Sequence, residues 1–489
     1  MLSRASSQWS GFNKTHFSQE RYSRTMPHRL TLVEMTEHIR QRKLSPVELV
    51  DAHLRQIAKL NPYLNAFVMQ FSEEAKTTAN QPAAGVLHGI PVTVKDSFDM
   101  QGLPTLCGSR FRLDHVARED STAVARLKAE GAIILGKTNC PEFLANWETD
   151  NFITGRTNNP WDLDRTAGGS SGGESAAIAS FCSAGGIGSD GGGSIRIPAH
   201  FCGIAGLKPT PGRVPATGHF PEISHPGGLL GVAGPMARTV ADVKLLFEVL
   251  SGHDPLDPFS APVPVRKLSI ENQCIGVVEQ FLDEPVEECM RTAVTKAARL
   301  LASSGFTTDR FLPAGLEEAR ELWRFFFVEL AAPFTRDVVK RKQADAHWTG
   351  TELMDMTDPN RIITGREVVE NLGVRDRMRA ALMQQMKRYP VLLMPVCATT
   401  AFPHGKRSWE IDDHKLGLLD LMSPVTPWNL LGMPSLVVPM DVTPEGLPIG
   451  VQIVGRPYEE ELLLHIGEAL ETARGPFAAP TLAGFASKS

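Results

Sequence analysis

The sequence lacks the features of membrane, nucleic-acid-binding and disulfide-rich proteins. It has no run of about 18 apolar residues, so we expect no membrane-spanning helix. A net charge of −5 offers no basic surface for nucleic acid or an anionic membrane. The seven cysteines form no C-x-x-C pair and no metal-ligand spacing, which argues against a disulfide framework and a metal site and favours a reducing, cytoplasmic compartment.

The two ends of the chain differ in character from its middle. Residues 1–29 are basic and serine-rich, and Met26 offers a second start, so we expect an N-terminal extension that is disordered or a start-site artefact rather than a transit peptide. Residues 30–480 are expected to form one domain, with a helical, cap-like region at about 285–390. Residues 481–489 are expected to be a C-terminal tail.

Helix and strand signals alternate along the chain. Ser45-Pro46-Val47-Glu48 is a capping box with proline at the first helical position, and it predicts a helix running toward Lys59. A β-branched run at 89–96 predicts a buried strand that ends near Lys95. Because strand signals return at 391–395 and 450–455, we expect a single interwoven α/β domain.

Two glycine-rich segments each present a serine. Residues 168–174 contain Ser170, and residues 188–199 contain Ser194. Glycine lets a substrate approach the main chain closely, and successive N–H groups up to Ser194 predict an anion-binding nest. A serine hydroxyl needs an adjacent base at neutral pH, and a lysine whose charged form is disfavoured by burial can serve.

Three segments together resemble the amidase signature family. They are Gly-Ile-Pro-Val-Thr-Val-Lys ending at Lys95, Gly-Gly-Ser-Ser-Gly-Gly around Ser170 and Gly-Gly-Ser-Ile-Arg around Ser194. Ser170 follows Lys95 by 75 residues and precedes Ser194 by 24 residues, in agreement with the family. The resemblance runs from about Leu32 to Glu471 and implies a single large domain with a central mixed β-sheet covered by helices.

The resemblance also implies roles for these residues. Ser194 is the expected nucleophile, Ser170 the proton relay, which follows a cis peptide in the family, and Lys95 the base. The expected oxyanion hole is formed by Gly191, Gly192 and Gly193. The family usually carries a larger residue, commonly threonine, where this chain has Gly191, which predicts a more flexible loop or more room above the hole.

Other side chains near the motifs are given less specific roles. We expect Asp190 and Arg196 to pair and hold the nucleophile loop. In relatives the segment with Leu144, Asn146 and Trp147 borders the substrate channel, so these three residues are candidate substrate contacts. An aromatic group is expected to belong to the core because of its helical spacing, and it comprises Trp323, Phe325, Phe326 and Phe327.

These observations favour an amidohydrolase without a cofactor or metal that cleaves small or aryl amides through an acyl-enzyme. Esters and carbamates (urethanes) are related candidate substrates because attack and oxyanion stabilisation are shared. One alternative is a glutamine-dependent amidotransferase subunit that supplies ammonia to a partner. Another is a binding protein that retains the fold without catalysis. A homodimer is also a candidate assembly.

Two other motifs match the glycine segments literally. Residues 168–172 satisfy G-x-S-x-G, the nucleophile elbow of α/β-hydrolases, which requires a preceding strand and a later acid and histidine. We set this motif aside because residues 158–162 are not expected to form a strand. Residues 186–191 satisfy G-x-G-x-x-G, but that dinucleotide motif should open a helix, and here more glycine follows.

Overall fold

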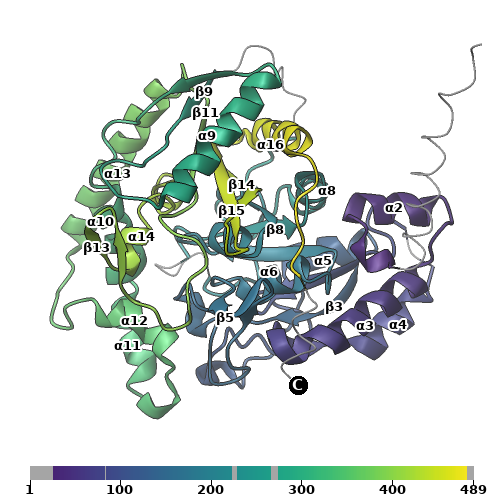
Figure 1. Ribbon diagram of the computed structural model, residues 1–489. Coiled ribbons are helices and arrows are strands. Elements are labelled where there is room, and N and C mark those ends of the chain that lie inside the picture. Colours follow the sequence, from purple (N-terminus) through teal and green to yellow (C-terminus); the bar gives the residue numbers. More distant parts are fainter. Residues whose placement is uncertain (1–25, 83, 223–227, 266–273, 482–489) are drawn as a thin grey trace, which may run out of the picture.

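The computed structural model describes residues 26–82, 84–222, 228–265 and 274–481. The predicted C-terminal tail lies outside these ranges except for one residue, and the predicted N-terminal extension lies outside them up to position 25. Figure 1 shows a large sheet with helices on both sides, and helices α10 to α13 grouped at one side of the molecule.

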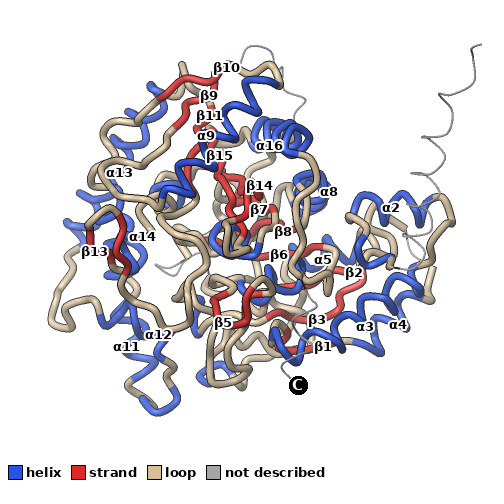
Figure 2. The backbone as a smooth tube through the Cα atoms, viewed as in Figure 1, coloured by secondary structure: helices blue, strands red, loops and turns tan. Residues whose placement is uncertain are grey.

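The centre of the molecule is an 11-stranded sheet that twists across the whole domain (Figure 2). Neighbours pair in parallel at β2–β3, β2–β6, β9–β10 and β9–β11 and antiparallel elsewhere, so the sheet is mixed. Its strands in spatial order are β1 (Phe67–Gln70), β3 (Ile133–Thr138), β2 (Pro91–Lys95), β6 (Gly185–Asp190), β8 (Val232–Ala237), β7 (Ala205–Lys208), β14 (Ser435–Val442), β15 (Pro448–Gly455), β11 (Val391–Pro395), β9 (Cys274–Val277) and β10 (Thr307–Arg310).

Helices cover both faces of this sheet. Leu436 contacts α16 (Glu460–Arg474) at Gly467, whereas its neighbour Val437 lies beside Gly450, which faces His200 of α7 (Arg196–Cys202). Successive strand residues point to opposite faces, so α7 and α16 lie on opposite sides. Helix α6 (Gly172–Ala179) packs with α7, and helices α8 (Val240–Leu250) and α9 (Glu288–Ser303) pack with α16. The predicted α/β fold with a mixed central sheet is confirmed.

The N-terminal helices begin where the sequence places their caps. Helix α2 (Leu32–Arg40) is capped by Thr31, and helix α3 (Pro46–Leu64) has the predicted capping box between Ser45 and Glu48. Helix α3 runs past Lys59 and ends at Leu64, and its C-cap Asn65 adopts the left-handed conformation with φ of 52°. Two further helices, α4 (Ser72–Ala79) and α5 (Thr122–Ala129), lie at the same end of the sheet.

A second group of helices lies at one side of the sheet in Figure 1. We call it the α10–α13 segment; it comprises α10 (Ala319–Arg324), the π-helical turn η4 (Phe325–Glu329), α11 (Ala332–Val339), α12 (Trp348–Asp355) and α13 (Gly365–Gln385). Short elements after it are β12 (Trp409–Ile411), β13 (His414–Leu416), α14 (Leu418–Leu421) and α15 (Pro427–Leu430).

The expectation that residues 158–162 form no strand is wrong. Asn158–Asn159 (β4) and Asp162–Thr166 (β5) pair as a small antiparallel hairpin outside the main sheet. The Asn159 amide nitrogen donates to the Thr166 carbonyl at 3.0 Å, and its oxygen accepts the Trp161 N–H at 2.9 Å. The asparagine side chain therefore builds the turn, which a β-propensity pattern does not reveal.

The described residues also bear on membrane and metal binding. Over these ranges, no helix combines the length and apolar character needed to cross a bilayer. The same residues hold no cluster of three or more histidine, cysteine or acidic side chains that could bind a metal ion. All seven cysteines are free thiols.

Candidate active site

The predicted site residues meet at the ends of two neighbouring parallel strands. Lys95 is the last residue of β2, and Ser189 and Asp190 end the adjacent strand β6. Ser170 lies just before α6, and Ser194 just before α7. Ligands of open α/β sheets commonly bind outside the carboxyl ends of the strands. The three predicted catalytic residues are therefore brought to a common edge although 99 positions separate the first from the last.

The Lys95 side chain is fully buried among hydroxyl groups. Its Nζ lies 2.7 Å from Ser170 Oγ and 3.0 Å from Ser189 Oγ. Burial lowers the pKa of Lys95 to about 8, because a charged amine loses its hydration there. A lysine with this pKa is neutral in about a tenth of molecules at pH 7, and the neutral amine can accept a proton.

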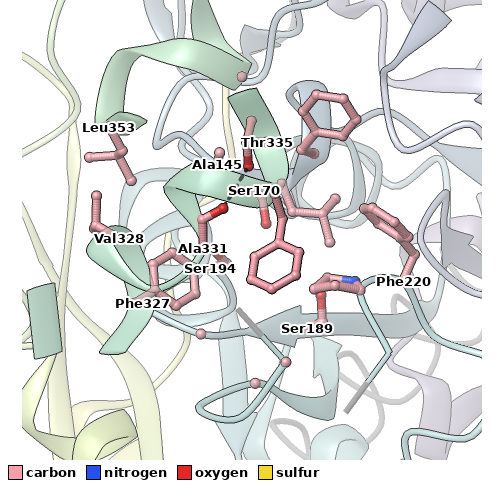
Figure 3. A pocket seen from close by; sticks show the side chains of 18 of the residues that line it. Ala145, Ser170, Ser189, Ser194, Phe220, Phe327, Val328, Ala331, Thr335 and Leu353 are labelled. Atoms are coloured by element: carbon pink, nitrogen blue, oxygen red, sulfur yellow. Dashed lines mark hydrogen bonds between the residues drawn. The ribbon is translucent and has the colours of Figure 1, made fainter. Parts of the chain in front are cut away.

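The two serines lie on the wall of one cavity (Figure 3). The Gly169–Ser170 peptide bond is cis, as the resemblance implied. The Ser171 N–H donates to the Ser194 carbonyl at 3.2 Å, which ties the two glycine-rich segments together. Within the part of the chain that the structure describes, no hydrogen bond joins the Ser170 and Ser194 hydroxyls; both groups face the cavity.

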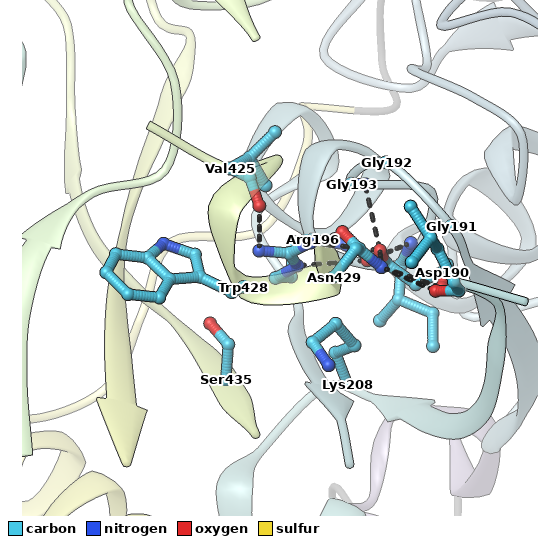
Figure 4. Close-up of polar contacts among 12 residues, drawn as sticks. Asp190, Gly191, Gly192, Gly193, Arg196, Lys208, Val425, Trp428, Asn429 and Ser435 are labelled. Carbon is cyan, nitrogen blue, oxygen red and sulfur yellow. Dashed lines mark hydrogen bonds and ion pairs between the residues drawn. The ribbon is translucent and has the colours of Figure 1, made fainter. Parts of the chain in front are cut away.

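We call residues 190–196, which carry the predicted nucleophile Ser194, the nucleophile loop. This loop is anchored by a buried ion pair between Asp190 and Arg196 (Figure 4). Arg196 Nη2 lies 2.9 Å from Asp190 Oδ1, and its Nη1 donates to the Val425 carbonyl at 2.8 Å. Asn429 Nδ2 also donates to Asp190 Oδ1 at 2.9 Å. Burial disfavours the carboxylate, but the Arg196 guanidinium, the nearby charge of Lys208 and the hydrogen bond from Asn429 together outweigh this effect and hold the pKa of Asp190 below its usual range. The predicted pairing of these two residues is confirmed.

The Asp190 carboxylate also divides the N–H groups of the loop into two sets. It accepts the N–H groups of Gly193 at 2.8 Å, Ile195 at 3.0 Å and Arg196 at 3.3 Å. Among the described residues, no acceptor meets the N–H groups of Gly191, Gly192 and Ser194. The Gly193 N–H, expected in the oxyanion hole, is thus engaged inside the loop, whereas those of Gly191 and Gly192 are available.

Two indole N–H groups donate hydrogen bonds to backbone carbonyl groups of the same loop. Trp147 Nε1 donates to the Gly192 carbonyl at 3.0 Å, and Trp323 Nε1 donates to the Gly191 carbonyl at 2.8 Å. Both rings are buried. Sequence reasoning missed the contact of Trp323, because its helical spacing is equally typical of a core residue and no local pattern links it to a loop 132 residues earlier.

The cavity beside the serines has a volume of about 510 Å³ and a largely apolar wall. One side comes from the loops of the sheet domain and the other from the α10–α13 segment (Figure 3). Exposed Asp337 and Arg341 lie where it opens to solvent. Its apolar lining includes Phe143, Leu144, Ala216, Phe220, Pro221, Phe327, Val328, Ala331, Leu353 and Met354.

The three candidate substrate contacts are placed differently. Leu144 lines the cavity, whereas Asn146 and Trp147 are not part of its wall. Asn146 Nδ2 donates to Glu352 Oε2 at 2.6 Å, and the Trp147 indole is turned to the Gly192 carbonyl. The structure places Ser189, Phe220 and Phe327 at the cavity; of the aromatic group expected in the core, Trp323, Phe325 and Phe326 are buried there and Phe327 packs against it.

Known proteins share this architecture over most of their length. The Amidase family profile matches residues 48–464. A glutamyl-tRNA(Gln) amidotransferase subunit of Roseiflexus sp. strain RS-1 is 35% identical over 485 residues, which cover 91% of this chain and 97% of the relative. Indoleacetamide hydrolase of Bradyrhizobium diazoefficiens is 34% identical over 469 residues, covering 91% of this chain and 87% of that one.

A solved structure of 6-aminohexanoate cyclic dimer hydrolase complexed with substrate superimposes with a TM-score of 0.83. The two sequences are 27% identical. The aligned region covers 93% of this chain and 99% of the hydrolase chain. Sequence and fold therefore agree over the segments that carry Lys95, Ser170 and Ser194. The chain belongs to the amidase signature family of hydrolases.

Proposed function

We propose that this protein hydrolyses amides through an acyl-enzyme on Ser194, with Ser170 as the relay and Lys95 as the base. The observation that carries the proposal is the buried contact of 2.7 Å between Lys95 Nζ and Ser170 Oγ beside the cavity that holds Ser194. A buried amine with a lowered pKa is suited to accept a proton, and the neighbouring hydroxyl is suited to pass it on.

Acylation begins when Ser194 Oγ attacks the amide carbonyl carbon. The Ser194 proton moves to Ser170 Oγ while the Ser170 proton moves to neutral Lys95. The negative oxygen of the tetrahedral intermediate accepts hydrogen bonds from the N–H groups of Gly191 and Gly192, which have no other acceptor among the described residues. When the C–N bond breaks, the proton on Lys95 returns through Ser170 to the leaving nitrogen.

Deacylation uses the same groups in reverse. A water molecule attacks the ester carbonyl of the acyl-enzyme, and its proton passes through Ser170 to Lys95. The C–O bond to Ser194 breaks, and Ser194 recovers a proton from the relay. The hydrogen bond between the two serine hydroxyls is expected to form once substrate fills the cavity, since catalytic contacts commonly tighten in the complex.

The cavity wall supports an apolar or aromatic amide as substrate. Phe143, Leu144, Phe220 and Phe327 surround the space next to the serines. Two of the relatives are named for amide substrates, indoleacetamide and a 6-aminohexanoate cyclic dimer. Esters and carbamates of similar shape follow as secondary substrates, because the attack and the oxyanion are alike.

The amidotransferase alternative rests on the 35% identity to the Roseiflexus protein. That function requires glutamine, a small polar amide, and a partner that receives ammonia. The largely apolar wall of the 510 Å³ cavity favours hydrolysis of apolar amides over glutamine.

A substrate panel tests these functions. The purified protein is assayed with anilides, aliphatic amides, glutamine, esters and carbamates, alongside Ser194→Ala and Lys95→Ala. We expect the highest kcat/KM on an apolar or aryl amide, no turnover by Ser194→Ala, and a loss of about 10²- to 10⁴-fold in Lys95→Ala, the usual contribution of a general base. Preference for glutamine would support the amidotransferase function, and a Lys95→Ala rate above about a tenth of wild type would contradict the base assignment.

A further inference from the structure

Two aromatic side chains of the α10–α13 segment rest directly on the nucleophile loop. Trp323 and Phe327 stand one helical turn apart and stack with ring centroids 4.8 Å apart and planes 16° apart. We call this pair the aromatic clamp. Phe327 belongs to η4, a π-helical turn, a type of turn found frequently at functional sites.

Trp323 fixes one peptide of the loop by hydrogen bonding and packing. Its Nε1 donates to the Gly191 carbonyl at 2.8 Å. Peptide groups are planar and trans, so this bond also fixes the direction of the Gly192 N–H, which points opposite to that carbonyl. A Cβ on Gly192 would lie 2.5 Å from Trp323 Cζ2, so the indole fills the space of a side chain at this position.

Phe327 fills the space of a side chain at Gly191, as Trp323 does at Gly192. A Cβ on Gly191 would lie 2.6 Å from Phe327 Cε2 and 3.3 Å from its Cζ. Gly191 is not among the glycines with positive φ, so its backbone would accept alanine. The three atoms nearest to such a Cβ all belong to the phenyl ring. The missing side chain at this position therefore leaves no empty space above the loop, since Phe327 occupies it.

We propose that the aromatic clamp positions the Gly191–Gly192 peptide for oxyanion binding and thereby couples the α10–α13 segment to catalysis. Trp323 is a positioning residue that acts through the Gly191 carbonyl. Phe327 limits the acyl pocket beside Ser194, stacks on the indole and packs over Gly191. The proposal rests on the hydrolytic function of Ser194 proposed above.

Replacement of the indole donor is the first test. Trp323→Phe keeps an aromatic ring and removes the N–H. With 4-nitroacetanilide as the probe, we expect kcat to fall about 10-fold or more while KM stays within about twofold, because the lost interaction matters for the oxyanion and not for ground-state binding. The rate of Ser194 labelling by a fluorophosphonate should fall in parallel.

The matched control is Trp161→Phe. Trp161 Nε1 also donates to a backbone carbonyl, that of Cys202 at 2.8 Å, at the far end of α7. The two variants remove the same chemical group, so a general loss of stability would lower kcat in both. Equal kcat values for Trp323→Phe and Trp161→Phe would overturn the positioning role.

A double-mutant cycle at positions 191 and 327 provides a second test that does not depend on the folding of the tryptophan variant. Gly191→Ala alone should lower kcat because its Cβ displaces Phe327 or the loop. In the Phe327→Ala variant, which lacks the ring, Gly191→Ala should lower the logarithm of kcat by less than half as much as it does in the wild-type protein. Additive effects of the two substitutions would contradict the coupling.

The outcomes also separate this proposal from the proposed function. Wild-type protein that fails to react with the fluorophosphonate contradicts the nucleophile assignment itself. Wild-type protein that reacts while all clamp variants react at the same rate contradicts the clamp alone. The fluorophosphonate rate is measurable even if 4-nitroacetanilide is a poor substrate.

Discussion

Asp96 and Lys137 form a fully buried ion pair, with Asp96 Oδ1 2.7 Å from Lys137 Nζ, immediately beyond the end of the strand that carries Lys95. Lys137 also donates to the Pro104 carbonyl at 2.8 Å. The carboxylate that follows Lys95 in sequence is thus committed to another cation, as Asp190 is to Arg196. Lys95 Nζ contacts the Ser170 and Ser189 hydroxyls and, at 3.5 Å, the Ser189 carbonyl, which suits the neutral amine that the proposed mechanism requires.

The buried pair predicts a large stability effect of Lys137→Met. Removal of one partner leaves an uncompensated carboxylate in the interior, which typically costs about 3–5 kcal/mol. Burial already raises the pKa of Asp96, so its protonation at low pH should relieve part of the loss. We therefore expect a smaller destabilisation at pH 5 than at pH 8, as measured by urea unfolding. Lys128→Met, at an exposed pair with Asp120, is the control and should cost under about 1 kcal/mol.

The pH profile of hydrolysis should report the ionisation of Lys95. The proposed mechanism needs the neutral amine, and burial lowers the pKa of Lys95 to about 8. The neutral fraction is about one half at this pKa and nears its maximum about one pH unit above it, so kcat/KM should increase as pH rises through about 8 and then level off. A flat profile between pH 6 and 9 on an amide substrate would contradict the assignment. Lys95→Arg should be inactive throughout, because arginine remains protonated.

Asp190→Asn should weaken both stability and turnover. The carboxylate accepts three loop N–H groups and pairs with buried Arg196, whereas an amide offers one oxygen and no charge. We expect a loss of about 3–5 kcal/mol in unfolding free energy, by the same reasoning as for other broken buried pairs. Asp441→Asn breaks an exposed pair with Lys296 and should change stability little. Equal effects of the two changes would argue against the anchor.

Gly193→Ala separates backbone strain from crowding in the loop. Gly193 has a φ of 99°, and a Cβ there would lie 2.9 Å from Ile197 Cγ1 and 3.1 Å from Val425 Cγ1. Gly446 has a φ of 89° with nothing within 4 Å of such a Cβ. Both alanine variants should be destabilised by roughly 1–2 kcal/mol, because alanine disfavours the left-handed backbone conformation. Only Gly193→Ala should lose further stability and turnover, which unfolding and anilide assays would measure.

The placement of Lys95, Ser170 and Ser194 beside one another was largely predictable, because each lies in a short local sequence pattern. A strand that ends at Lys95 and serines on glycine-rich turns leave patterns within a few residues. The side chains that pack against these segments leave no such local pattern. Trp147 was expected to touch substrate, yet its indole is turned to the Gly192 carbonyl, and the sequence alone does not tell on which side of a loop a ring packs.

The long-range contacts were the other part that sequence reasoning missed. Trp323 and Phe327 occur at a spacing typical of any buried helix face, and only their position over Gly191 and Gly192 gives them a further role. The β4–β5 hairpin was missed for a different reason: its turn depends on the side-chain hydrogen bonds of Asn159 rather than on β-branched residues.

The close approach of Phe327 to Gly191 restricts the order in which this enzyme could change over evolutionary time. A larger residue at position 191 meets the ring, so it either displaces Phe327 or the loop, at a cost in turnover, or follows a smaller residue at position 327. A change at position 327 that enlarges the cavity while the loop stays unchanged is therefore the less costly first step. Directed evolution that diversifies both positions together should reach new specificities that single-site libraries miss.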